Sequence, residues 1–263
     1  MKKYLVIGNP IDHSLSPKLH NYWIAQNKIK AIYEKKLAYK NDLKKILDDI
    51  REKKISGLNV TVPFKKDVIS FLDQLSPEAK ETQSVNTIYL KDDKIFGHNT
   101  DIVGFQLNIK HINFNISGKK IFILGAGGVV PSIIFALNKM EASDIILSNR
   151  TKEKAENLKN LFSNITVVNW GEVPNFDMVI NATSVGLNKK DELGLNFSKV
   201  EKNSLFYDVI YNPKNTNFLD NGKKLGHKTE NGKMMFVYQA SAAFEIWHNV
   251  KPNINNEVLE LLD

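Results

Sequence analysis

Short apolar runs alternate along this chain with longer stretches in which apolar residues recur at helical spacing. Such alternation is typical of parallel α/β folds, in which a helix connects one strand to the next. Near the start of the chain, Ser16 precedes Pro17, which predicts a helix N-cap followed by proline in the first turn. In this first part, strands are expected at residues 4–7, 32–37, 57–62 and 94–96, and helices at residues 17–26 and 43–53.

A second series of strands and helices begins near Val103. It opens on an apolar strand that ends at a cluster of glycines. A chain of 263 residues exceeds the usual size of a single hydrophobic core, so the two series predict two domains with a boundary near residue 102. In the second part, strands are expected at residues 120–124, 144–148, 165–168, 178–181 and 205–209, and helices at residues 132–139, 152–162, 234–247 and 255–262.

The composition excludes several classes of protein and of site. Hydrophobic residues make up 42% of the chain and charged residues 25%, which is near the average for soluble globular proteins. No apolar stretch approaches the roughly 20 residues that span a bilayer, and the run at residues 4–7 is shorter than a signal-peptide core of about 7–15 residues. Cysteine is absent, which excludes disulfides and thiol nucleophiles. The six histidines lack the close spacing of zinc ligands on a helix, so no metal site is expected.

The formal net charge of +7 comes mostly from lysine and raises the question of an acidic partner. The lysines are scattered over helical segments such as residues 43–54 and 152–159, and no basic run interleaved with aromatic residues stands out. We therefore expect a solvated, lysine-rich surface and neither a nucleic-acid nor a membrane partner. A positive field of this kind also favours the capture of small anions.

The glycine cluster Gly125-Ala126-Gly127-Gly128 lies between a predicted strand and a predicted helix. Glycines there allow the backbone to approach a pyrophosphate, and the helix N-terminus supplies free N–H groups and a positive dipole end. The third glycine of the common G-x-G-x-x-G pattern is replaced by Val130. The motif indicates a dinucleotide site, while an ordinary tight turn stays open as the alternative.

The end of the next predicted strand distinguishes between the two nicotinamide cofactors. NAD-binding units place Asp or Glu about 20 residues after the glycines, where it binds the ribose 2′-hydroxyl. This chain has Asn149-Arg150-Thr151 at that place, with Lys154 close behind. Guanidinium and ammonium groups pair with a 2′-phosphate, which a carboxylate would repel. The sequence therefore predicts NADP(H).

Two segments before the second series carry more polar groups than a strand or turn needs. One runs from Asn59 to Lys65 and stops at Pro63, and the other is Gly97-His98-Asn99-Thr100-Asp101. If Lys65 and Asp101 met in a cleft between the domains, the lysine could pass a proton and the aspartate could orient it. From spacing alone, a surface salt bridge is the favoured interpretation.

The chain resembles the shikimate dehydrogenase family. The resemblance covers essentially the whole chain, and the ordered combination of its motifs is specific although each motif alone is weak. The motifs are Ser14-Leu15-Ser16-Pro17, Asn59-Val60-Thr61-Val62-Pro63-Phe64-Lys65, Ser84-Val85-Asn86-Thr87, Asn99-Thr100-Asp101, Gly125-Ala126-Gly127-Gly128, Asn149-Arg150-Thr151, Asn181-Ala182-Thr183-Ser184 and Gln239-Ala240.

The resemblance implies a role for each matching residue. The substrate carboxylate would be held by Ser14 and Ser16 with help from Tyr211, and Lys65 would act as acid/base or electrostatic partner of the reacting oxygen, next to Asp101. The ring hydroxyls would bind Thr61, Asn86, Asp101 and Gln239, supported by Asn59. The cofactor would lie against Gly125, Ala126, Gly127, Gly128 and Val129, with Asn149, Arg150, Thr151 and Lys154 at the 2′-phosphate and Val209 and Gly232 at the nicotinamide.

The family further implies an α/β fold with an N-terminal substrate domain at residues 1–102, onto which residues 233–263 pack back, and a Rossmann domain at residues 103–232. It implies a cytoplasmic enzyme, monomeric or homodimeric, that uses NADPH to reduce 3-dehydroshikimate reversibly to shikimate. The chain departs from the family at Val129, Val130 and Pro131, at Lys233 and Met234, and at Ile102, which puts cofactor affinity in doubt. Two alternatives stay open: an NAD-preferring quinate/shikimate dehydrogenase, and a non-catalytic binding protein on the same fold.

Overall fold

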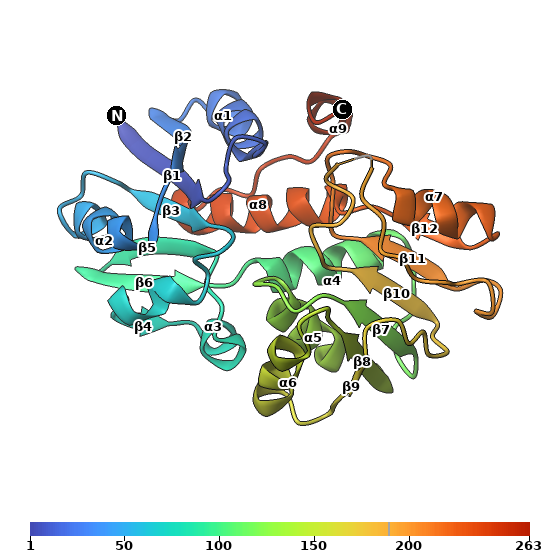
Figure 1. Ribbon diagram of the computed structural model, residues 1–263. Coiled ribbons are helices and arrows are strands. Elements are labelled where there is room, and N and C mark those ends of the chain that lie inside the picture. The colour runs from blue at the N-terminus through green and yellow to red at the C-terminus, as the bar shows by residue number, and fades with distance from the viewer. Residues whose placement is uncertain (189) are drawn as a thin grey trace. The chain divides into compact units, whose positions relative to one another are not determined.

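The computed structural model describes residues 1–188 and 190–263, which form two compact units. The first unit contains residues 1–104 and 237–263, and the second contains residues 105–236. Each unit is built on a six-stranded sheet. Helix α4 (Asp101–His111) and helix α8 (Lys233–His248) each contain a point at which the chain passes from one unit to the other (Figure 1).

The sheet of the first unit is mixed and has the strand order β2-β1-β3-β5-β6-β4. Strand β5 (Thr87–Lys91) runs antiparallel to both of its neighbours. The other elements are β1 (Lys2–Gly8), α1 (Ser16–Gln26), β2 (Ala31–Leu37), α2 (Leu43–Arg51), β3 (Gly57–Val60), β4 (Gln74–Leu75), α3 (Pro77–Thr82), β6 (Lys94–His98), α9 (Asn256–Leu261) and two short 3₁₀ turns, Lys40–Asp42 and Asp67–Phe71.

Alternation along β1 assigns its side chains to two different faces of the sheet. Leu5 and Ile7 belong to the core that α2 completes with Ile46 and Ile50. Tyr4 points the other way and packs on Trp247 of α8, with 5.0 Å between the ring centroids. The sheet is therefore covered on both sides, and a near-continuous apolar β1 is what such a position requires.

The second unit has a fully parallel sheet with the order β12-β11-β10-β7-β8-β9. Phenylalanines from two strands, from α7 and from the loop before β10 form a hydrophobic cluster that includes Phe122, Phe176, Phe206 and Phe218. The elements are β7 (Lys120–Leu124), α5 (Val130–Lys139), β8 (Asp144–Ser148), α6 (Lys152–Leu161), β9 (Ile165–Val168), β10 (Met178–Asn181), β11 (Leu205–Asp208), α7 (Asn217–Lys224) and β12 (Lys228–Glu230).

The structure corrects several local expectations. Helix α1 already includes Ser16, and its N-cap is Leu15, which makes no side-chain capping bond. Strand β3 ends at Val60 because the chain turns toward Pro63, and α5 begins at Val130, two residues before its expected start. The pattern also missed elements that are short, polar or without clear periodicity, namely β4, β5, β12, α3, α4 and α7.

Within residues 1–188 and 190–263, no helix is both long enough and apolar enough to cross a bilayer.

Candidate active site

Lys65 and Asp101 form a buried ion pair in the first unit. Lys65 follows β3 through Pro63 and Phe64, and Asp101 is the first residue of α4. The Lys65 Nζ lies 2.5 Å from the Asp101 Oδ2, and each side chain is only 9% exposed. The expectation of a surface salt bridge was wrong, because the tertiary fold brings together two segments that the sequence separates. Burying two charges is costly unless further hydrogen bonds satisfy them.

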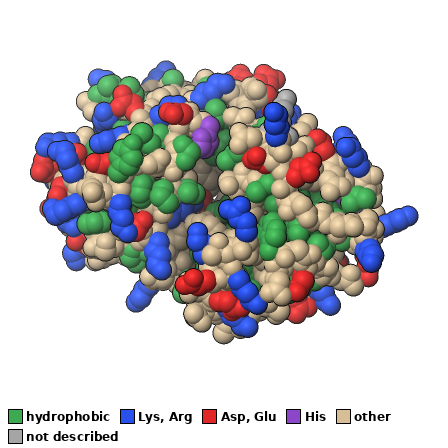
Figure 2. Space-filling model, viewed as in Figure 1, with side chains coloured by type: hydrophobic (Ala, Val, Ile, Leu, Met, Phe, Trp, Pro, Cys, Tyr) green, Lys and Arg blue, Asp and Glu red, His purple; other side chains and the backbone are tan. Residues whose placement is uncertain are grey.

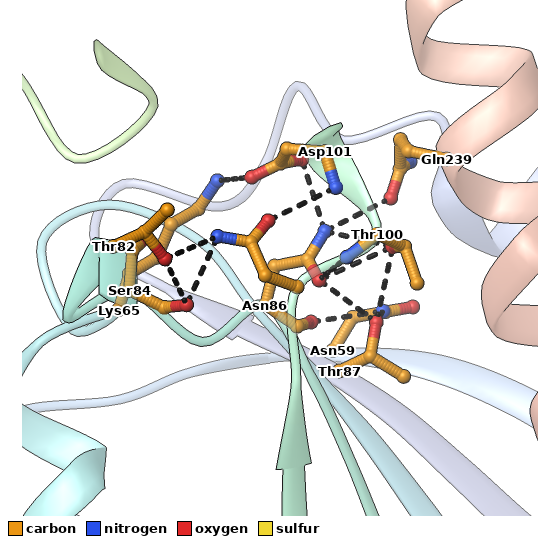
Figure 3. A network of polar contacts seen from close by, with 10 residues as sticks. Asn59, Lys65, Thr82, Ser84, Asn86, Thr87, Thr100, Asp101 and Gln239 are labelled. Carbon is orange, nitrogen blue, oxygen red and sulfur yellow. Dashed lines mark hydrogen bonds and ion pairs between the residues drawn. The ribbon is translucent and has the colours of Figure 1, made fainter. Parts of the chain in front are cut away.

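Asn86 supplies those further bonds at the centre of the network in Figure 3. Its Nδ2 donates to the Asp101 Oδ1 at 2.9 Å and to the Gln239 Oε1 at 3.4 Å. Its Oδ1 accepts from the Thr100 backbone N–H at 2.8 Å and from the Thr87 hydroxyl at 3.0 Å. The Thr100 N–H can only donate, so the orientation of the Asn86 amide is fixed and its NH₂ group must face Asp101.

Asn59 forms the next layer of the network, below Asn86. Its Nδ2 donates to the Asn86 carbonyl at 3.0 Å and to the Thr87 hydroxyl at 3.1 Å. Its Oδ1 accepts from the Tyr33 hydroxyl at 2.6 Å, and the Tyr33 ring stacks on His20 at 4.2 Å between centroids. These bonds hold the polar residues rigidly before any ligand arrives.

The chemistry of this cluster follows from its charges. The Asp101 carboxylate accepts hydrogen bonds from Lys65 and Asn86, an arrangement that suits an anion. A buried ammonium that is held by a carboxylate can stabilise negative charge that develops on a substrate oxygen, or can give that oxygen a proton.

The remaining residues expected at the substrate have separate places. The Ser14 hydroxyl accepts from the Ser16 backbone N–H at 3.4 Å at the start of α1, where Ser16 is buried. The Thr61 backbone N–H donates to the Ile7 carbonyl at 2.9 Å beside the end of β1. Tyr211 belongs to the second unit, where its ring stacks on Phe236 at 4.4 Å.

The glycine turn of the second unit follows β7 directly. Gly125 has φ +109°, and a Cβ on it would lie 2.8 Å from the Ala182 carbonyl oxygen, so only glycine fits. A Cβ on Gly127 would meet nothing closer than 3.8 Å. Helix α5 then begins, and Val129 at its N-cap makes no side-chain capping bond. The turn and the first amides of α5 form a cradle that fits a pyrophosphate.

The chain between β8 and α6 carries the residues expected at a 2′-phosphate. The Asn149 Nδ2 donates to the Thr151 carbonyl at 2.7 Å, which folds this segment back on itself. Arg150 and Lys154 are exposed, and within residues 1–188 and 190–263 neither side chain takes part in a hydrogen bond or ion pair. Two uncommitted cations at this place fit a phosphate better than a ribose hydroxyl.

Val209 and Gly232 lie side by side at the ends of β11 and β12. The Val209 N–H donates to the Asn181 carbonyl at 3.0 Å, and the Gly232 N–H donates to the Ile210 carbonyl at 3.1 Å. A Cβ on Gly232 would collide with the backbone of Val209, so glycine is required there. Among the described residues, no group of three or more potential metal ligands is present.

Comparison with family models identifies both parts of the chain. Residues 6–88 match the model described as shikimate dehydrogenase substrate binding domain, and residues 107–217 match the model described as shikimate / quinate 5-dehydrogenase. The chain belongs to the shikimate dehydrogenase family. The resemblance predicted from the motifs is thereby confirmed, as is the α/β fold with a substrate domain and a Rossmann domain.

Individual shikimate dehydrogenases are similar to this chain over its full length, which supports the family assignment. A shikimate dehydrogenase (NADP(+)) of Pelagibacter ubique is 57% identical, covering 100% of this chain and 99% of the relative. A shikimate dehydrogenase structure in complex with NADP+ matches with a TM-score of 0.92 at 32% identity, covering 100% and 96% of the two chains. A Thermus thermophilus enzyme solved with NADP(H) and shikimate has a TM-score of 0.90 at 29% identity, covering 100% and 98%.

The sequence interpretation missed several residues of this shikimate dehydrogenase network. Thr87 and Thr100 lie inside two of the family motifs, next to Asn86 and Asp101. Their place in those motifs could have indicated that they belong to the network. Tyr33 gave none, because it lies in an ordinary strand and reaches Asn59 only through the parallel pairing of β1 with β2 and β3.

Proposed function

We propose that this chain is an NADP-dependent shikimate dehydrogenase that reversibly reduces 3-dehydroshikimate to shikimate. The observation that carries the proposal is the buried Lys65–Asp101 pair, which Asn86 ties to Gln239 in a family whose members act on this substrate. A buried charge pair surrounded by directional donors is more than packing requires, and such clusters mark functional sites.

Lys65 acts on the oxygen of the reacting carbonyl. NADPH held by the second unit would be the source of the hydride for the ketone carbon at position 3 of the ring. The Lys65 ammonium stabilises the negative charge that then develops on the oxygen and is the group that can donate a proton to it. Asp101 orients Lys65 through their ion pair, and Asn86 keeps Asp101 in place.

The substrate is a small anion with several hydroxyl groups, and the proposed contacts match that chemistry. Ser14 and Ser16 bind the carboxylate through their hydroxyls, together with Tyr211. Thr61, Asn86, Asp101 and Gln239 bind ring hydroxyls, and Asn59 supports them. A site that is built to bond hydroxyls rejects analogues without them, because its own polar groups would be left unpaired.

The second unit holds the cofactor in this proposal. Gly125, Ala126, Gly127, Gly128 and Val129 cradle the pyrophosphate at the N-terminus of α5. Asn149, Arg150, Thr151 and Lys154 bind the 2′-phosphate, and Val209 and Gly232 lie against the nicotinamide. The uncommitted charges of Arg150 and Lys154 support NADP(H) over NAD.

An assay of shikimate oxidation with each cofactor tests the function directly. Purified enzyme should turn over shikimate with NADP+ far better than with NAD+, because Arg150 and Lys154 follow β8 and Asn149 stands where an NAD-binding unit has a carboxylate. We also expect shikimate to be a better substrate than quinate. A clear preference for NAD+ would favour the quinate/shikimate alternative. Absence of turnover together with salt-dependent nucleic-acid binding would favour the non-catalytic protein.

The proposal also assigns a role to each domain, a location and a state of assembly. We place substrate binding in residues 1–102 with 233–263 and cofactor binding in residues 103–232. We also propose a cytoplasmic location and a monomer or homodimer without nucleic-acid or membrane partners, as the family resemblance implies.

A further inference from the structure

Asp208 is a fully buried carboxylate at the end of β11 that none of the roles above uses. Among the described residues no lysine or arginine pairs with it. Burial raises the pKa of the Asp208 carboxyl to about 6, although the hydrogen bonds that it accepts from Thr216, Ile210 and Asn181 lower it. A buried charge without a counter-ion persists only when donors converge on it.

Three residues supply those donors: Asn181 at the end of β10, and Ile210 and Thr216 in the loop between β11 and α7. The Thr216 hydroxyl donates to the Asp208 Oδ2 at 2.6 Å, and the Ile210 backbone N–H donates to the Oδ1 at 3.0 Å. The Asn181 Nδ2 lies 3.1 Å from the Oδ1 and 3.2 Å from the Oδ2. The N–H groups of Asn181 and Ile210 can only donate, so the constellation is built for an ionised carboxylate.

Each donor in turn fixes a loop. The Asn181 Oδ1 accepts from the Thr183 backbone N–H at 3.1 Å and from its hydroxyl at 2.7 Å, and the Asn181 Nδ2 also donates to the Val185 carbonyl at 3.0 Å. Thr216 is the N-cap of α7, where its hydroxyl accepts from the Leu219 N–H at 3.3 Å. Asp208 is therefore the point at which the loops after β10 and β11 are joined.

These loops touch the surfaces to which cofactor binding was assigned. A Cβ on Gly125 would meet Ala182 and Thr183 of the loop after β10. Val209 follows Asp208 directly, and its backbone lies against Gly232. In the parallel sheet, β10 lies between β7 and β11, so the glycine turn and the Val209 segment flank the same central loop (Figure 1). Ligands bind at this carboxyl edge of parallel strands.

We propose that Asp208 is a positioning residue for the cofactor: its buried carboxylate, by holding Asn181, Ile210 and Thr216 together, fixes the loops against which the pyrophosphate and the nicotinamide bind. This inference rests on the proposed NADP-dependent activity and adds a determinant of cofactor affinity that touches neither substrate nor cofactor. Its direct contacts all lie in the second unit. Among the proposed substrate residues only Tyr211 shares the loop after β11, so we expect the loss of Asp208 to weaken NADP(H) binding much more than shikimate binding.

The first test is Asp208→Asn, which keeps the size of the side chain but replaces an acceptor oxygen by a donor facing other donors. We expect the KM for NADP+ and the Kd for NADPH, measured by fluorescence titration, to rise about 10- to 100-fold, as the loss of hydrogen bonds to a charged group implies. The Kd for shikimate should rise by no more than about threefold, because the proposed substrate residues other than Tyr211 lie in the first unit. Asp220→Asn, at an exposed aspartate of α7, is the control that should change neither constant.

A matched pair at Thr216 keeps the test decisive if Asp208→Asn does not fold. Thr216→Ser retains the hydroxyl and should bind NADPH as the wild type does, whereas Thr216→Val removes it and should bind several-fold more weakly. Unchanged NADPH affinity in folded Asp208→Asn or Thr216→Val, or an equal loss of shikimate affinity, would overturn the inference. A wild-type enzyme without NADP-dependent turnover would instead refute the proposed function.

Discussion

At the scale of the residue, the candidate site depends on direction as much as on charge. The Thr100 backbone N–H can only donate, and it fixes the orientation of the Asn86 side-chain amide. The Asn86 backbone carbonyl can only accept, and it fixes the orientation of the Asn59 side-chain amide. Asp101 therefore receives donors on both oxygens, from Asn86 and Lys65. Such preorganisation lets a site stabilise developing charge without reorganising during the reaction.

Lys65→Ala tests the role of the ammonium. Turnover should fall by about 10²–10⁴, the usual contribution of a positioned acid or base, because the oxygen loses its electrostatic partner. Steady-state kinetics of shikimate oxidation measure this, with Lys66→Ala at the exposed neighbouring lysine as the control. Near-normal turnover in a folded Lys65→Ala enzyme would refute the role.

Arg150→Asp tests the assignment of the 2′-phosphate. We expect weaker binding of NADPH, by about 10-fold or more, because an attractive charge becomes a repulsive one, while shikimate binding changes little. The measurement is a fluorescence titration with NADPH. Lys159→Asp makes a similar change of charge on α6 and controls for the overall field. Equal effects of the two variants would mean that Arg150 does not contact the phosphate.

At the scale of the element, α1, β2 and α8 meet in an aromatic cluster that encloses a histidine. His20 stacks on Tyr33 and packs edge-on against Trp23, and in the described part of the chain neither of its ring nitrogens has a hydrogen-bond partner. Burial, and then the neighbouring His248, lowers the pKa of His20 to about 3. Burial, and then Lys2, lowers the pKa of His248 to about 4.

These lowered pKa values predict acid sensitivity of the first unit. His20 takes up a proton near pH 6.5 in the unfolded chain but only near pH 3 in the folded one. The stability that the neutral, buried His20 gives to the folded state is therefore complete above pH 6.5 and is lost progressively as the pH falls toward 3. The free energy of unfolding should fall by up to about 1.4 kcal/mol per pH unit for His20.

Urea unfolding at pH 7, 6 and 5 measures this slope. Trp23 and Trp247 report on the first unit once Trp170 of the second unit is replaced by Phe. His20→Leu should flatten the dependence on pH, and His111→Gln, at an exposed histidine, should not. An equally steep slope in His20→Leu would exclude His20 as the cause.

At the scale of the whole molecule, the first unit needs both ends of the chain. Residues 237–263 belong to it, and Trp23 Nε1 donates to the Asn253 carbonyl at 3.0 Å while Trp247 Nε1 donates to the Ile88 carbonyl at 3.2 Å. The net charge of +7 is not gathered in one patch on the face in Figure 2, where basic and acidic side chains alternate. The net positive charge still favours the capture of small anions.

The sequence by itself determined the elements with strong periodicity, the glycine turn, the cations that follow β8, and the order of family motifs. These features are local, because each depends on residues a few positions apart. It also determined that thiol chemistry is absent, because the chain has no cysteine.

Only the tertiary structure decided which distant residues meet and how deeply they are buried. Spacing favoured an exposed Lys65–Asp101 pair, and the fold buried it; Tyr33 and Asp208 looked like ordinary strand residues until strand pairing brought Asn59 and Asn181 beside them. The physical reason is that burial and the supply of hydrogen-bond donors depend on sheet order. Sheet order arises from contacts between segments whose separation along the chain carries no local signal.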